Sequence, residues 1–189
     1  MNWRGVLDAN AVAALLPVDD AHFAKPICDG LAVFLEGLPV ARQTEIFGAQ
    51  ASLGATAAVS ERLGLLARSC PVLQKIGQIL ARDRRLAPEL RGQLRQLESL
   101  PPTGPREQIQ ADLVRELGPL APRGVTLTPP ALAEASVAVV MPFRQQDARG
   151  SCQEGVFKLL KPGIEELLES ELSLLEDVGI HFDERCEEL

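Results

Sequence analysis

The stretch CPVLQKIGQILARDRRLAPELRGQLRQLESLPP, residues 70–102, decides how this chain folds. Its first half spaces apolar residues as one face of a helix does; these are Val72, Leu73, Ile76, Ile79 and Leu80. Lys75 and Gln78, three residues apart, project together from another face. Pro88 suits the first turn of a second helix, which we expect to run to about Leu100. The stretch therefore predicts a helical hairpin over about residues 71–100.

A glycine interrupts the first helix of this hairpin. Gly77 lies between Lys75 and Gln78, and a glycine inside a helix costs about 1 kcal/mol relative to alanine. We therefore expect another part of the molecule to approach the backbone there. Taken without their surroundings, Lys75 and Gln78 also fit the solvated side of an ordinary amphipathic helix.

The same residues resemble those of a known family. Lys75-Ile76-Gly77-Gln78 matches the KxGQ signature of the UbiB (AarF) family of atypical protein-kinase-like proteins. In that family the signature follows a GPxFxK lead-in and precedes ILSxRPDLLPxEYxxEL…LQDxVPP. Four pieces of this chain follow the same order: Pro71–Lys75, Gln78–Arg84, Leu86–Leu90 and Leu97–Pro102. The resemblance implies that Lys75, Gly77 and Gln78 face the nucleotide cleft, because the KxGQ helix of the family lies over it.

Composition indicates an ordinary globular protein. The 189 residues are 46% hydrophobic and 24% charged, enough for one good core or for a domain with an appendage. With six Phe, one Trp and no Tyr, leucine and alanine must do most of the packing, which favours a mainly helical body. The formal net charge of −7 argues against a nucleic-acid-binding surface, since such a surface needs clustered cations.

Cysteine usage and hydropathy bear on metal binding and location. The four cysteines form no CxxC pair and there are only two histidines, so we expect no metal site and a reducing compartment. No run reaches ~18 apolar residues, and the N-terminus lacks the order of a secretory signal. We expect a cytoplasmic protein, either soluble or peripherally associated with a membrane.

The pattern changes from helical to strand-like in a proline-rich region near residues 119–124. We therefore predict two domains, a helical extension over 1–118 and a second domain over 119–189. The second domain is expected to contain three strands and a helix: Val125–Thr128, Ala133–Met141, Glu154–Leu160, and Ile164 to about Val178, closed by Gly179.

The order strand, turn, strand, helix resembles the start of a protein-kinase-like small lobe. The predicted fold class is therefore α+β, with a helical extension packed on an incomplete small lobe made of an antiparallel sheet and one helix. The run Lys158 to Ile164 resembles the VAVKVQRPGI run of the family, which implies that Lys158 binds the α- and β-phosphates of a nucleotide. By itself Lys158 also fits an ordinary edge strand. Val156 stands where the family has alanine beside the adenine, which would narrow the pocket.

The segment Ala133–Ala138 resembles the alanine-rich loop that UbiB proteins carry in place of a glycine-rich loop. The resemblance implies a nucleotide-binding role for Ala135, Ser136 and Ala138, whose small side chains let backbone N–H groups approach a phosphate. Glu134 replaces a small residue of the family, and Val139 and Met141 replace Gln and His. Because a carboxylate beside phosphates is repulsive, we expect Glu134 to weaken nucleotide binding. The segment also fits a plain core strand.

The resemblance covers about residues 65–180 and includes no Asp-Phe-Gly, HRD-like or DxxxxN-like loop. We expect either a piece of a longer kinase-like protein or a natural short form, with no catalytic or metal-binding residues in this chain and no activity by itself. The partner of Lys158 stays open among five glutamates: Glu165, Glu166, Glu169, Glu171 and Glu176.

For the complete protein, the family implies ATP or ADP with magnesium and a role in isoprenoid-quinone (ubiquinone) or lipid metabolism. The chain would then belong to the phosphotransferase class while lacking its catalytic loops. The alternative is a non-catalytic helical interaction module, or a pseudokinase remnant, that binds a protein partner or a membrane surface.

Overall fold

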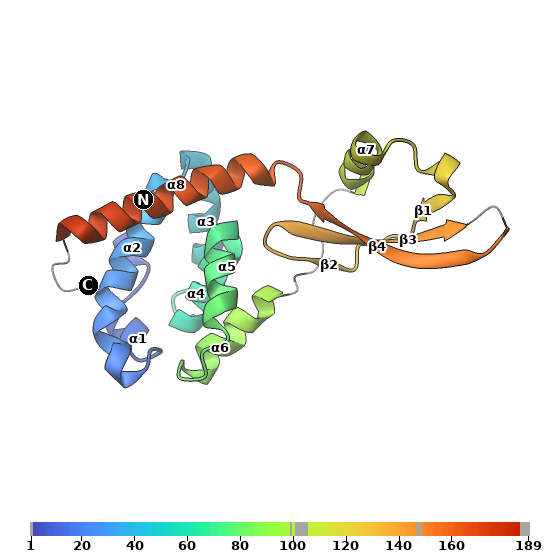
Figure 1. Cartoon of the computed structure of the whole chain (residues 1–189). Helices are drawn as coiled ribbons and strands as arrows, with labels where there is room; N and C mark the ends of the chain where they lie inside the picture. The colour runs from blue at the N-terminus through green and yellow to red at the C-terminus, as the bar shows by residue number, and fades with distance from the viewer. Residues whose placement is uncertain (1, 99, 101–105, 147–148, 186–189) are drawn as a thin grey trace. The chain divides into compact units, whose positions relative to one another are not determined.

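The computed structural model describes residues 2–98, 100, 106–146 and 149–185 (Figure 1). It contains two compact units, one formed by residues 1–97 with 166–189 and the other by residues 98–165. The first is helical and the second is built on an antiparallel sheet. The fold class is therefore α+β, as the sequence predicts, and it is consistent with a kinase-like small lobe that carries a helical extension.

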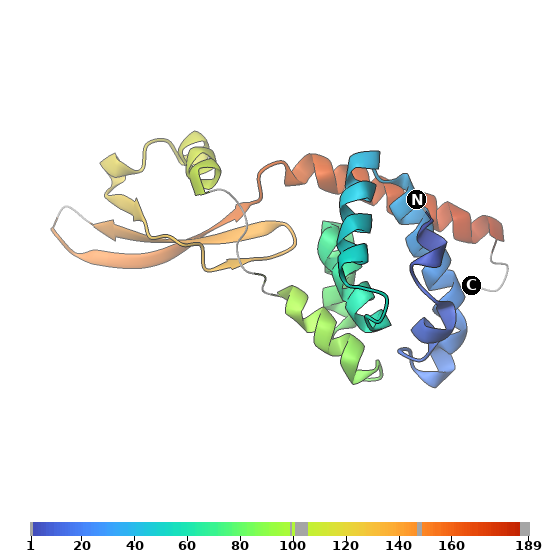
Figure 2. The same ribbon diagram turned by 180° about the vertical axis from the view of Figure 1, so that it is seen from behind.

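The helical unit contains α1 to α6 and most of α8. The α-helices are α1 (Ala9–Ala13), α2 (Ala24–Gly37), α3 (Val40–Ser52), α4 (Val59–Ser69), α5 (Pro71–Leu80), α6 (Pro88–Arg95) and α8 (Ile164–Arg185). Short 3-10 helices join them: η1 (Trp3–Gly5), η2 (Val18–Phe23) and η3 (Gln96–Glu98). Figure 2 shows α8 passing across α2. A Cβ on Gly30 of α2 would lie 2.7 Å from the ring of Phe182, so α2 and α8 pack closely.

The predicted hairpin is present as α5 followed by α6, and both helices begin at a proline. The second helix is shorter than predicted, because α6 ends at Arg95 and η3 at Glu98, and Leu100 pairs with Glu134 instead. The predicted apolar face of α5 is wrong in part, because Ile76, Ile79 and Leu80 are 38%, 58% and 46% exposed. The buried face instead includes Leu73, Gln74 and Gly77. Gly77 and the amide groups of Gln74 and Gln78 thus lie on the side of α5 that meets α6 and Leu97, and the three apolar side chains remain exposed.

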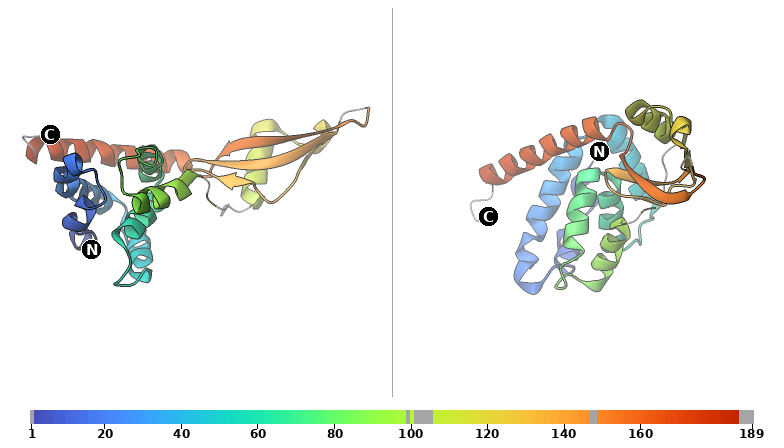
Figure 3. Two further views of the ribbon diagram at one scale, coloured as in Figure 1. Left: turned by 90° about the horizontal axis from the view of Figure 1, so that it is seen from below. Right: turned by 45° about the vertical axis from the view of Figure 1, so that its right-hand side comes forward.

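The sheet unit contains α7 (Arg106–Leu117), η4 (Ala121–Arg123) and four strands. The strands are β1 (Val125–Leu127), β2 (Ala133–Glu134), β3 (Ala138–Gln146) and β4 (Cys152–Leu160). Strand β3 is central, since β4 pairs with one of its edges and β1 and β2 pair in succession with the other. Figure 3 shows the long β3–β4 ribbon of this unit.

Three details of the predicted second domain are corrected. The expected single strand Ala133–Met141 is two strands, because the chain reverses in a turn closed by a hydrogen bond from Ala135 N to Ala138 O (2.8 Å). Strand β3 continues past the predicted end at Met141 and reaches Gln146. Helix α8 passes Gly179 and reaches Arg185, because Phe182 continues its contact with α2.

The two faces of the sheet have different environments. Directly paired residues share a face, and successive residues alternate. One face carries Val139, Met141, Phe157 and Leu159, which pack with Ile109 and Leu113 of α7; we call it the covered face. The other carries Val140, Pro142, Val156, Lys158 and Leu160; we call it the open face, because Val156, Lys158 and Leu160 are exposed.

Helix α7 thus packs in one core with the strands, so the compact sheet unit begins before the boundary predicted at residues 119–124. The predicted division into domains stays a prediction. Within the part of the chain that the structure describes, no helix is both long and apolar enough to cross a lipid bilayer.

Candidate functional site

The open face centres on Lys158. This residue pairs across the ladder with Val140, and Val156 pairs with Pro142, so the amine rises from a surface of apolar side chains. Lys158 is exposed, and it forms no ion pair among the described residues. A free cation over an apolar platform can bind a flat apolar group and an adjacent anion together. Val156 lies on the same face, two residues before Lys158 along β4, and its place beside an adenine stays a prediction.

The covered face fixes the position of Lys158. Phe157 stacks on Phe143 of the neighbouring strand with ring centroids 4.3 Å apart. A Cβ on Gly155 would lie 2.6 Å from the end of the Phe143 ring, so that ring needs the glycine beneath it. The residues on either side of Lys158 along β4 point to this core and set the register that leaves Lys158 on the open face.

The residues predicted from the alanine-rich loop form the turn between β2 and β3. Ala138 pairs with Leu160 and lies on the open face. It is two residues before Val140, which pairs with Lys158. The structure therefore brings Ala138 and Lys158 together on neighbouring strands. Ser136 is 5% exposed and Ala138 is 3% exposed, while Ala135 is half-buried. Whether Ala135, Ser136 and Ala138 bind nucleotide stays a prediction.

Glu134 lies on the opposite face from Lys158. It pairs with Val139, a residue of the covered face, and its side chain is buried. One carboxylate oxygen lies 2.7 Å from Nζ of Lys161, immediately beyond β4. The carboxylate is therefore paired with Lys161 and lies on the face away from Lys158. No local sequence pattern indicates this ion pair, because the face on which Glu134 lies depends on where the hairpin turns.

The KxGQ residues occupy different environments on α5. Lys75 is exposed, whereas Nε2 of Gln78 donates to the Leu97 carbonyl at 2.8 Å. Gln74 donates to the same carbonyl at 3.0 Å. A Cβ on Gly77 would lie 2.8 Å from Cδ1 of Leu97, so the expected close approach is confirmed and the approaching group is the end of the hairpin. The orientation of Lys75, Gly77 and Gln78 toward a nucleotide cleft stays a prediction.

A buried carboxylate supports α5 from α8. The N-cap residue, Cys70, makes no side-chain capping bond, and the Val72 N–H donates instead to Glu171 Oε2 at 2.9 Å. Glu171 is fully buried, and burial raises its pKa, partly opposed by the Val72 hydrogen bond and by Arg42. Burial, reinforced by the Glu171 charge, also raises the pKa of Cys70 to about 12. Glu171 therefore caps the N-terminus of α5, and its carboxylate is engaged by the Val72 N–H.

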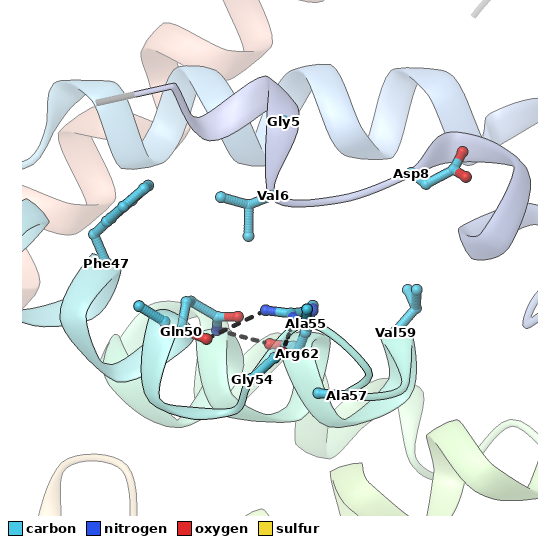
Figure 4. A pocket seen from close by; sticks show the side chains of 11 residues that line it. Gly5, Val6, Asp8, Phe47, Gln50, Gly54, Ala55, Ala57, Val59 and Arg62 are labelled. Carbon is cyan, nitrogen blue, oxygen red and sulfur yellow. Dashed lines mark hydrogen bonds between the residues drawn. The ribbon is translucent and has the colours of Figure 1, made fainter.

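A cavity of about 500 Å³ lies in the helical unit between η1, α3 and α4 (Figure 4). Arg62 donates to the carbonyl oxygens of Gln50 (3.2 Å) and Gly54 at the end of α3. Asp8 accepts from Asn10 N at 2.9 Å and caps α1. Both charged side chains of the lining thus serve helix ends; the other lining residues are Gly5, Val6, Phe47, Ala51, Ala55, Ala57 and Val59. We assign no ligand to this cavity.

The open face presents a cation beside apolar side chains. Lys158 supplies the cation, and Val140, Pro142 and Val156 supply the apolar surface. Among the residues that the structure describes, no group of three or more His, Cys, Asp or Glu side chains could hold a metal ion.

Comparison with known proteins agrees with the resemblance. The chain is 35% identical over 107 residues to a protein of Marinobacter nauticus described as "Probable protein kinase UbiB". This chain is related to the UbiB family. The match covers 56% of the chain but only 19% of the UbiB relative, so the chain spans about a fifth of the length of the relative that it matches. No family model matches the chain, and no solved structure matches it.

Proposed function

We propose that this chain supplies the KxGQ-bearing extension and the small lobe of a UbiB-like atypical kinase or ATPase, and that the open face binds adenine nucleotide. The observation that carries the proposal is the exposed amine of Lys158 among Val140, Pro142 and Val156. The apolar residues would receive the adenine and the amine would pair with phosphate oxygens. A nucleotide supplies the transferable phosphoryl group when bound.

The complete UbiB-like protein would act in ubiquinone or lipid metabolism and would use ATP or ADP with magnesium. This part of the proposal comes from the UbiB relationship. Since the sequence contains no Asp-Phe-Gly, HRD-like or DxxxxN-like loop, we expect this chain to show no phosphoryl transfer by itself.

Nucleotide binding can be measured directly. Thermal unfolding of the chain is followed with and without millimolar Mg-ATP, because a ligand of the native state stabilises it by RT ln(1 + [L]/Kd). We expect an upward shift that Lys158→Ala removes. Lys25→Ala is the matched control, since Lys25 is an exposed lysine of the helical unit paired with Asp29. A shift that survives Lys158→Ala, or no shift with the unmodified chain, contradicts the proposal.

A second candidate function is a non-catalytic interaction module. It is favoured by the exposed apolar side chains Ile76, Ile79 and Leu80 along α5, which present unpartnered surface to a protein or a membrane. Sedimentation with phosphatidylglycerol vesicles tests the membrane form, and Ile79→Ser should reduce it. Vesicle binding that is lost with Ile79→Ser, together with no effect of Mg-ATP, would favour this candidate over the nucleotide site.

A further inference from the structure

The ion pair between Glu134 and Lys161 lies at the place where the β2–β3 turn meets the end of β4. Glu134 Oε1 and Lys161 Nζ are 2.7 Å apart, and the two side chains are 9% and 22% exposed. A pair shielded to this extent is screened much less than a surface pair, and losing one partner leaves a buried charge. The ion pair can therefore hold the end of β2 against the residue that follows β4.

Backbone hydrogen bonds join the same segments. The Lys161 N–H donates to the carbonyl of Val137 at 3.0 Å, inside the turn that Ala135 and Ala138 close. Glu134 is also bridged through its backbone to Leu100, with N···O distances of 3.0 and 3.1 Å. Lys161 thus contacts the turn through its backbone and contacts Glu134, the residue just before the turn, through its side chain.

We propose that Glu134 and Lys161 form a latch that positions the Ala135–Ala138 turn beside Lys158. The inference rests on the proposed function, since the turn would lie against nucleotide phosphates. It reverses the role expected for Glu134 from the sequence. The carboxylate lies on the covered face, so it supports the turn and does not oppose phosphates held by Lys158 on the open face.

The latch predicts the sign of a single substitution. Glu134→Gln keeps the shape of the side chain and removes its charge. If Glu134 repelled phosphates, this change would strengthen Mg-ATP binding. If Glu134 holds the turn, the change weakens binding; we expect about a tenfold rise in Kd, which corresponds to about 1.4 kcal/mol.

Amide hydrogen exchange of the full chain tests the latch without nucleotide. We expect the Ala135 and Lys161 amides to exchange about tenfold faster in Glu134→Gln, because both donate hydrogen bonds across the turn. Lys161→Met should have the same effect and serves as the second variant if Glu134→Gln does not fold. The matched control is Glu154→Gln, which removes the exposed pair with Arg144 in the same sheet and should leave these amides unchanged.

A double-mutant cycle separates the latch from two independent side chains. Replacing both Glu134 and Lys161 should disturb exchange no more than either single change, because the partners act together. Unchanged exchange in both single variants, additive effects in the double variant, or tighter Mg-ATP binding by Glu134→Gln would each overturn the latch. No Mg-ATP binding by the unmodified chain would contradict the proposed function and leave the exchange result as the test of the latch.

Discussion

Glu171→Ala should loosen the start of α5. Glu171 is fully buried on α8, and its Oε2 accepts the Val72 N–H at 2.9 Å across 99 residues of sequence. The helix has no other side-chain cap, because Cys70 at the N-cap position makes no such bond. Alanine removes the acceptor and leaves the Val72 donor buried.

The expected loss follows from these contacts. An unsatisfied buried donor costs about 1–3 kcal/mol. The space left by the side chain adds to this loss, while removing a carboxylate that burial disfavours offsets part of it. We expect a net loss of about 2 kcal/mol in the free energy of unfolding, or about 4–8 °C in Tm for a chain of this size.

Glu171→Gln gives a pH-dependent companion test. Burial raises the pKa of Glu171 in the folded chain above its ordinary value of 4.5. Protonation of Glu171 therefore favours the folded chain, and this contribution to the free energy of unfolding is fully present below pH 4.5. It is lost as pH rises through the folded-state pKa. The unmodified chain should therefore lose stability relative to Glu171→Gln as pH rises from about 4.5, since glutamine does not titrate there.

Both effects can be measured by urea unfolding followed by circular dichroism, with hydrogen exchange of the Val72 amide as a local readout. Glu169→Ala, an exposed position on the same helix, is the control and should change stability by less than about 0.5 kcal/mol. A loss for Glu171→Ala no larger than that of the control, with the Val72 amide still protected, would refute the long-range cap.

Three further predictions concern glycines and thiols. Gly77→Ala should lower the free energy of unfolding by about 1–3 kcal/mol despite the better helix propensity of alanine, because the new Cβ would meet Leu97. Gly92→Ala, with open space around it, should raise the free energy of unfolding by up to about 1 kcal/mol. Urea unfolding should therefore show stability changes of opposite sign for the two variants. Gly155→Val should destabilise by about 1–3 kcal/mol because the facing aromatic ring of β3 leaves no room, and an unchanged Tm would contradict that packing. Iodoacetamide near neutral pH should label the exposed thiol of Cys152. It should leave Cys70 unreacted until the chain unfolds, because Cys70 is buried and its pKa is about 12. Labelling of Cys70 before unfolding, detected by mass spectrometry of digests, would contradict its burial.

Local sequence signals predicted the parts of the fold that depend on local physics. Pro88 marked the second helix of the hairpin, and Gly77 marked a close approach that Leu97 makes. The strand bearing Lys158 followed from its composition and from the resemblance. These signals act within a few residues, so a sequence can display them.

The missed features depend on long-range geometry. The Glu171 cap joins residues 99 positions apart, and a run of glutamates on a helix ordinarily indicates a solvated face. The face of Glu134 is set by the turn at Ala135–Ala138, and a one-residue shift in that turn would reverse it. No local pattern specifies either contact.

The central claim is that the open face of the sheet receives a nucleotide through Lys158. The most direct measurement is an NMR titration of the ¹⁵N-labelled chain with millimolar Mg-ATP. Saturable shifts confined to the amides of Val140, Val156, Lys158 and the Ala135–Ala138 turn, and absent in Lys158→Ala, are the result we predict. Shifts that are absent, or that lie on the helical unit and persist in Lys158→Ala, would contradict it.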